Sequence, residues 1–187
     1  VRGYQMQANR DMGPVNTALG GQVEKPISWG AEHHREFSER IGRVIPIASI
    51  GEDLPELHNE VVLDHDMTDS DGISAPKTNY VLSDNSKKMM AHSIERSSEV
   101  LEAAGAKKVF ENPLLKGGGF HLMGTAKMGM DTDDSVVNEW GRAHDVRNLF
   151  IVDGSVFVTS GGVNPTSTIQ ALALRVADHI KRNSRHI

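Results

Sequence analysis

A histidine in a glycine-flanked loop is the first feature of this 187-residue sequence that could do chemistry. His121 lies between Gly119 and Gly124 in the stretch GFHLMGTAKMG, and glycine lets the main chain approach another molecule closely. An imidazole accepts or releases a proton near neutral pH, which suits a general base. The alternative is a structural histidine that is hydrogen-bonded to the backbone of its loop, and on chemistry alone that alternative is the more common one.

A second candidate site follows an apolar run over residues 148–153 (NLFIVD). The run ends in an Asp-Gly turn, and the sequence GGVNPT follows at residues 161–166. We expect a helix to begin at Asn164 and Pro165, so that free N–H groups and the positive end of the helix dipole lie beside the turn. Such a place suits phosphate or a developing anion. The alternative is that Asn164 is an ordinary N-cap and Pro165 the first helical residue, which requires no ligand.

The composition argues against several other chemistries. Because the chain has no cysteine, it has no disulfide, thiolate zinc site, iron–sulfur cluster or cysteine nucleophile. No two of its nine histidines stand three or four residues apart, as a helical metal pair would, and no G-x-S-x-G motif supports a serine hydrolase. We therefore expect no metal site.

The net charge of -5, without a basic run, argues against nucleic acid as a partner of this chain. No apolar stretch of the sequence is long enough to span a membrane.

Residues 1–118 predict an antiparallel sheet flanked by helices, which is an α+β fold, because strands are followed by one helix instead of alternating with helices. Residues 1–30 are rich in breakers and are expected to be irregular. The glycines at 117–119 mark the main boundary. The expected elements are a helix over 32–42, an edge strand over 44–50, two antiparallel strands over 59–64 and 77–82, and a long helix over 83–105.

Residues 119–187 predict a loop, a strand, a second loop and a C-terminal helix. The strand, over 148–153, is expected to be covered on both faces because its apolar run is continuous. The second loop covers 154–163. The helix is amphipathic, and its apolar stripe is Ile169, Leu172, Ala173, Val176 and Ile180.

Together, in this order and at this separation, the two candidate segments resemble a known family. Residues 121–129 read H-L-M-G-T-x-K-M-G, and residues 154–173 read G-S-V-F-V-T-S-G-G-V-N-P-T-S-T-I-Q-A-L-A. With the intervening 138–153, they closely resemble the C-terminal signature of the glucose–methanol–choline (GMC) flavoprotein oxidoreductases. The resemblance is dense over residues 119–182, and residues 51–105 are more loosely similar to the substrate domain of that family.

The resemblance implies specific roles. His121 would face the flavin as the catalytic base, and Asn164 would hydrogen-bond the substrate oxygen. The cofactor contacts would come from Asp153, Gly154, Pro165 and Thr166. The first two would lie beside the ribityl and diphosphate part of FAD, and the last two begin a helix that would point at the pyrimidine edge of the flavin. The implied reaction is transfer of a hydride from the CH–OH group of an alcohol, sugar or sugar acid to flavin N5. Within the family, the H-L-M-G-T-x-K-M-G motif and the Asn-Pro-Thr sequence are more similar to those of sugar and sugar-acid members, such as pyranose oxidase or gluconate dehydrogenase, than to those of choline members.

The G-x-G-x-x-G fingerprint that grips the FAD diphosphate is not in this sequence. The resemblance therefore implies the C-terminal portion of a longer enzyme. Residues 1–118 would be part of the substrate-binding domain, and residues 119–187 would be the catalytic loop and the segment that completes the FAD-binding domain. FAD is the expected cofactor of the whole enzyme, together with its N-terminal FAD-binding portion, and we expect this chain alone to bind FAD weakly or not at all.

The alternative function is a catalytically silent binding or interaction module that keeps the same fold. The enzyme interpretation is favoured because His121 and Asn164 are both present, and a silent relative would need neither. The sequence indicates no compartment, since a chain without cysteine suits the cytoplasm or the periplasm.

Overall fold

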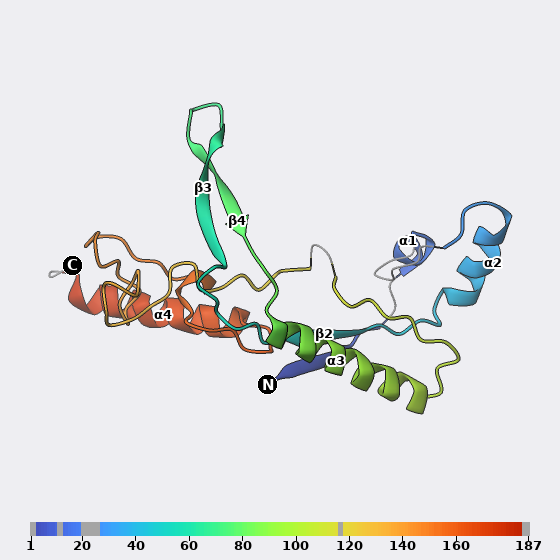
Figure 1. Ribbon diagram of the computed structural model, residues 1–187. Coiled ribbons are helices and arrows are strands. Elements are labelled where there is room, and N and C mark those ends of the chain that lie inside the picture. The colour runs from blue at the N-terminus through green and yellow to red at the C-terminus, as the bar shows by residue number, and fades with distance from the viewer. Residues whose placement is uncertain (1–2, 11–12, 20–26, 116–117, 185–187) are drawn as a thin grey trace. The chain divides into compact units, whose positions relative to one another are not determined.

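The computed structural model describes residues 3–10, 13–19, 27–115 and 118–184, and Figure 1 shows their helices and strands. The chain divides into two compact units. The first comprises residues 1–51 and 87–119, and the second comprises residues 52–86 and 120–187. Over the described ranges, no helix has both the length and the apolar character needed to cross a membrane.

The first unit contains a two-stranded antiparallel sheet, in which β1 (Tyr4–Ala8) pairs with β2 (Ile47–Gly51). The long helix α3 (Asp84–Ala103) continues into this unit from Lys87. It lies against the sheet, because the Tyr4 hydroxyl is 2.9 Å from Nδ1 of His92 and Met89 is almost fully buried. The expected helix over 83–105 is confirmed. The expected edge strand begins only after its proline, as β2.

The prediction that residues 1–30 are irregular is wrong for two segments, β1 and the short helix α1 (Gly13–Ala18). Five residues are too few for a reliable alternation, and the partner strand of β1 lies about forty residues further along the chain. Part of this stretch lies outside the described residues, namely 1–2, 11–12 and 20–26. Gly117, at the predicted boundary, also lies outside them.

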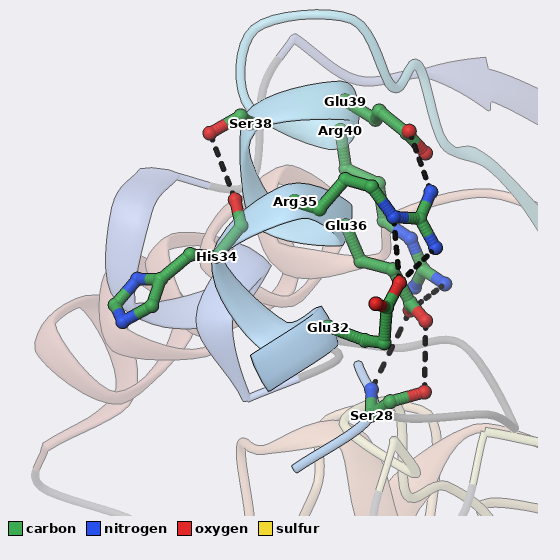
Figure 2. Close-up of polar contacts among 8 residues, drawn as sticks. All are labelled: Ser28, Glu32, His34, Arg35, Glu36, Ser38, Glu39 and Arg40. Carbon is green, nitrogen blue, oxygen red and sulfur yellow. Dashed lines mark hydrogen bonds and ion pairs between the residues drawn. The ribbon is translucent and has the colours of Figure 1, made fainter. Parts of the chain in front are cut away.

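Helix α2 (Ala31–Arg40) confirms the expected helix over 32–42. Figure 2 shows ion pairs between side chains that lie one turn apart on this helix. Arg35 forms ion pairs with both Glu32 and Glu39, and Arg40 forms one with Glu36. The Ser28 hydroxyl donates to Glu36 at 2.8 Å just before the helix begins, and this contact is the main cause that lowers the pKa of Glu36.

The second unit contains a β-hairpin made of β3 (Glu60–Thr68) and β4 (Ser74–Asn79). Figure 1 shows the two antiparallel strands joined by a short loop. Asn59 extends the pairing beyond the strands, because its side-chain oxygen accepts the N–H of Val81 at 2.7 Å. The two predicted antiparallel strands are thus confirmed, with shifted ends.

The rest of the second unit is built on helix α4 (Thr166–Asn183) and a long irregular segment before it. The stripe predicted for this helix is confirmed at its centre, where Val176 is only 5% exposed. Trp140 is stacked on His179, with ring centroids 4.0 Å apart, and the guanidinium of Arg175 lies 4.0 Å from its ring. The small core of the segment is formed by Val137, Ala143 and Val156, with Met128, Ile151 and Phe157 packed against it.

Residues 148–153 are irregular, so the prediction of a strand covered on both faces is wrong. Phe150 forms only an isolated bridge with Arg142, and the N–H of Ile151 donates to the carbonyl of Gly141 at 2.8 Å. The facing chain turns at Gly141, which has φ +68, so it cannot provide a partner strand of equal length. Two apolar side chains of the run are more than one third exposed, Leu149 and Val152.

The α+β class is confirmed. Its antiparallel strands form two separate two-stranded sheets, β1 with β2 and β3 with β4, where the sequence predicted one sheet. The second unit contains all six predicted site residues.

Candidate active site

Main-chain hydrogen bonds join the loop that carries His121 to the turn that follows Asp153. The N–H of Ala126 donates to the carbonyl of Ser155, and the N–H of Met128 donates to the carbonyl of Val156, both at 2.9 Å. Residues 154–156 form a short 3₁₀ turn, η1 (Gly154–Val156). Two segments about thirty residues apart in the sequence thus form one local structure.

Gly154 sets how closely these segments approach. It is buried, and a Cβ atom at this position would lie 3.0 Å from the carbonyl oxygen of Leu122 and 3.4 Å from Cδ1 of Ile169. Glycine therefore lets the main chain next to His121 pack directly on the turn, and it brings the first turns of α4 to the same place.

His121 itself is partly buried and lies in irregular backbone. It takes part in no hydrogen bond or ion pair with the other described residues. A structural histidine bonded to the backbone of its loop, the alternative left open by the sequence, is therefore not what the described contacts show. Within the described ranges, neither nitrogen of the imidazole has a hydrogen-bond partner.

Asp153 directly precedes the turn and caps its N-terminal end. Its carboxylate accepts the main-chain N–H of Ser155 at 2.7 Å, so Asp153 is the N-cap of η1. Interactions with the hydroxyl and then the N–H of Ser155 lower the pKa of the exposed Asp153, so the contacts of this turn favour the ionised carboxylate.

The start of α4 differs from the prediction in one respect. Pro165 occupies the N-cap position, and no side chain caps the helix, so Asn164 is not the N-cap. The reason is geometric: Pro165 has φ -90 and ψ -7, and its carbonyl already accepts the first helical bond, from Ile169 at 3.0 Å. Asn164 is exposed, and the contacts described in this structure give its amide no hydrogen bond. Pro165 is buried and Thr166 is exposed.

The structure thus brings together the His121 loop, the Asp153–Gly154 turn and the beginning of α4. The described contacts do not join the side chains of His121 and Asn164 to each other directly. The main chain next to His121 packs on Gly154, and so does Ile169 in the first turn of α4, the helix that Asn164 precedes.

Sequence reasoning missed a hydrogen-bonded group centred on Asp53. Its main chain bonds the hydroxyl of Ser160, and its carboxylate accepts the hydroxyls of Tyr80 and Ser86. Asp53 and Ser160 are 107 residues apart, and no spacing rule connects such distant positions. The only signal was an acidic residue shortly after a strand, since Asp53 lies two residues beyond the end of β2.

The donors and acceptors of this region fit a cofactor that is anionic and rich in hydroxyl groups. The N-terminus of α4 has no side-chain cap, so its first N–H groups and its dipole are available to negative charge. The ionised carboxylate of Asp153 can accept hydroxyl groups. Oγ1 of Thr159 is buried and has no hydrogen-bond partner within the described ranges. Those same ranges contain no group of three or more His, Asp or Glu residues that could hold a metal ion.

The sequence that forms this site matches a protein-family model. Residues 55–173, more than half of the chain, match the model described as "GMC oxidoreductase". The chain belongs to the GMC oxidoreductase family, as its sequence signature predicted.

Two curated relatives cover almost the whole chain. It is 42% identical over 183 residues to 2-methyl-1,2-propanediol dehydrogenase of Mycolicibacterium austroafricanum, which covers 97% of this chain and 33% of the relative. It is 35% identical over 178 residues to the fructose dehydrogenase large subunit of Gluconobacter japonicus, covering 95% and 31%. The chain therefore spans about a third of the length of these relatives.

A solved structure shows the same fold. The crystal structure of pyridoxine 4-oxidase from Mesorbium loti matches 76% of this chain and 31% of its own, with a TM-score of 0.57 and 20% sequence identity. At that identity the likeness concerns the fold alone.

Proposed function

We propose that this chain forms part of an FAD-dependent oxidoreductase that oxidises the CH–OH group of an alcohol or sugar, and that it supplies the catalytic pair His121 and Asn164. The main-chain pairing of the His121 loop with the turn after Asp153 carries this proposal. It makes one structure of the two segments that hold the family signature. The rest of the FAD-binding site would come from an N-terminal portion of the same protein, and this chain alone would bind FAD weakly or not at all.

In this proposal the chain handles the proton and the substrate oxygen. His121 accepts the hydroxyl proton of the substrate, for which both its nitrogens are available. Asn164 donates a hydrogen bond from its amide to the same oxygen, because its side chain is not used as a helix cap. When bound, FAD would supply the acceptor for the hydride.

The remaining site residues would hold the cofactor. The N-terminus of α4, from Pro165 and Thr166, favours negative charge by about 1 kcal/mol when partly buried. Asp153 would accept hydroxyl groups of the ribityl chain, and Gly154 would let the main chain approach. These assignments are consistent with the uncapped helix and with the ionised state of Asp153.

For the substrate class, we propose a small polyol or sugar. The two long matches are to enzymes whose names denote a diol and a ketose. Both substrates carry an oxidisable hydroxyl beside other hydroxyl groups, so a site with several hydrogen-bonding side chains would suit them.

The test is His121→Ala in the FAD-loaded enzyme that contains this chain. We expect the rate of flavin reduction at saturating substrate to fall by a factor on the order of 10² to 10⁴, as for loss of a general base, while bound FAD stays unchanged. Anaerobic stopped-flow absorbance measures both. His58→Ala, at an exposed histidine before β3, is the matched control and should reduce flavin at the wild-type rate.

The same experiment separates the enzyme from the silent module. Wild-type protein loaded with FAD that no alcohol or sugar reduces would favour the silent module. A normal rate in His121→Ala would instead keep the enzyme and remove His121 from its mechanism.

A further inference from the structure

Ser160 lies in the loop between η1 and α4, and its hydroxyl forms two hydrogen bonds with the main chain of Asp53. Oγ of Ser160 accepts the N–H of Asp53 at 3.0 Å and donates to the carbonyl of the same residue at 2.8 Å. The hydroxyl thus occupies both main-chain groups of Asp53, as a paired strand would. Such a double contact fixes the position of Ser160 better than a single hydrogen bond does.

Asp53 is itself anchored through its carboxylate. Oδ1 accepts the hydroxyl of Ser86 at 2.6 Å, and Oδ2 accepts the hydroxyl of Tyr80. Ser86 is only 2% exposed, and its hydroxyl also lies 3.0 Å from that of Ser83. Asp53 therefore links the loop of Ser160 to the end of the hairpin and to the first turn of α3.

Between Ser160 and the buried Pro165, the loop is irregular. It begins with Gly161 and Gly162, which have the widest backbone freedom of any residue type. Asn164 follows, exposed and without a capping bond, and the regular structure begins again only at Thr166. The anchored hydroxyl of Ser160 is the nearest fixed point before Asn164.

We propose that Ser160, held by Asp53, is a positioning residue that sets where the amide of Asn164 lies. This inference rests on the proposed function, in which Asn164 binds the substrate oxygen. Ser160 does not touch the substrate; it acts through the main chain of residues 161–163. Loss of its hydroxyl lets the two glycines move and displaces the amide, and a small displacement in a catalytic site costs a large factor in rate.

The test is a double-mutant cycle in the FAD-loaded enzyme, with Ser160→Ala, Asn164→Ala and both together. We expect Ser160→Ala to lower the flavin-reduction rate at saturating substrate at least about tenfold in the wild-type background. In the Asn164→Ala background the same change should cost less than about twofold, because the residue through which it acts is gone. Ser160→Thr, which keeps the hydroxyl, should restore most of the rate. Ser70→Ala, in the exposed turn of the hairpin, is the matched control.

A second readout does not depend on activity. Hydrogen exchange of the peptide that covers residues 158–165 should become faster in Ser160→Ala and stay unchanged in Ser70→Ala. Asp53→Ala should have a smaller effect than Ser160→Ala, because the main-chain groups that hold Ser160 remain.

Each failure points to a different step. An equal loss of rate in both backgrounds, or no loss in either, overturns the positioning role and leaves Asn164 in the mechanism. A wild-type rate in Asn164→Ala overturns both the positioning role and the proposed function of Asn164. Unchanged exchange in Ser160→Ala shows that the hydroxyl does not hold the loop, and this too overturns the inference.

Discussion

Helix α2 and the irregular segment over residues 120–165 are stabilised in opposite ways. The ion pairs of α2 join side chains three or four residues apart, and Arg35 pairs with one glutamate in each direction (Figure 2). The irregular segment is held by single main-chain bonds between distant positions, such as Met128 with Val156, and by the contact of Ser160 with Asp53.

The difference shows where one substitution has large consequences. A helix repeats its contacts at every turn, so the loss of one exposed pair leaves the others in place. The contacts of the irregular segment follow no repeating pattern, so each bond between distant positions fixes a different stretch of chain. The proposed catalytic residues, His121 and Asn164, lie on the irregular segment, where each position depends on its own few hydrogen bonds and packing contacts.

The largest effect on stability is expected for Gly141→Ala. Gly141 has φ +68, and a Cβ atom there would overlap the carbonyl oxygen of Ile151, which is main chain and cannot rotate away. The left-handed conformation and the overlap together should cost about 2–4 kcal/mol. Denaturant unfolding followed by Trp140 fluorescence, in a Trp29→Phe background, measures the second unit.

Gly161→Ala is the matched control for this change. A Cβ atom at Gly161 would meet only Cγ2 of Val163, at the ordinary distance of 3.6 Å. We expect a change in unfolding free energy below about 1 kcal/mol, of either sign. If both alanines had the same small effect, distant main-chain contacts would not define this segment.

A smaller but chemically specific effect is expected for Asn164→Asp. Because Asn164 does not cap α4, the change removes no structural bond, and a carboxylate near a helix N-terminus is tolerated. An ionised aspartate cannot donate to the substrate oxygen. Turnover of the FAD-loaded enzyme should fall at least about tenfold, which corresponds to ~1.4 kcal/mol in the barrier.

Thermal unfolding of the same variant should stay within a few degrees of wild type. Asn9→Asp, an exposed position in the first unit, controls for the added charge and should turn over normally. Wild-type turnover in Asn164→Asp would remove Asn164 from the catalytic pair.

The elements that were predicted correctly carry their pattern within one stretch of sequence. Helix α3 has capping residues before it and Gly105 after it, and α4 has an apolar stripe that repeats at every turn. The hairpin was predictable because both strands and their turn are contiguous. The glycine loop of His121 and the Asp-Gly turn were recognised from their residue types and order.

What was missed depends on partners that are distant in the sequence. Strand β1 exists because β2 lies beside it, and residues 148–153 are not a strand because the chain opposite them turns at Gly141. The N-cap of α4 is Pro165, one residue after the predicted Asn164, because the carbonyl of Pro165 accepts the first hydrogen bond of the helix. The Asp53–Ser160 contact could not be found from spacing, because no local pattern encodes a separation of that length. The division into a substrate-binding part and an FAD-binding part remains a prediction.

The Asp53 group also predicts a response to pH. Burial, and then the hydrogen bond to Asp53, raise the pKa of Tyr80 to about 12 from its ordinary value of 10.0. The neutral phenol is therefore favoured in the folded state. Its contribution to stability is fully present below about pH 10 and is lost as the pH rises through about 12.

Tyrosinate absorbance in a Tyr4→Phe background follows Tyr80 alone, since the chain has two tyrosines. Asp53→Ala should move the midpoint only part of the way back, because burial is the larger cause. A midpoint at the ordinary value in the protein with Asp53 would show that the phenol is not held by this group.

The smallest effect is expected for Arg35→Ala in α2. The side chains of Arg35, Glu32 and Glu39 are 58%, 61% and 59% exposed, so water and salt screen both ion pairs, and alanine favours the helix. The denaturant midpoint of the first unit, followed by Trp29 fluorescence in a Trp140→Phe background, should barely change.

Arg40→Ala is the comparison within the same helix. The side chain of Arg40 is 19% exposed, and its guanidinium lies 5.3 Å from the ring of Phe110. Its loss therefore also removes packing and should lower the midpoint measurably. A loss for Arg35→Ala as large as for Gly141→Ala would mean that α2 depends on single contacts as the irregular segment does.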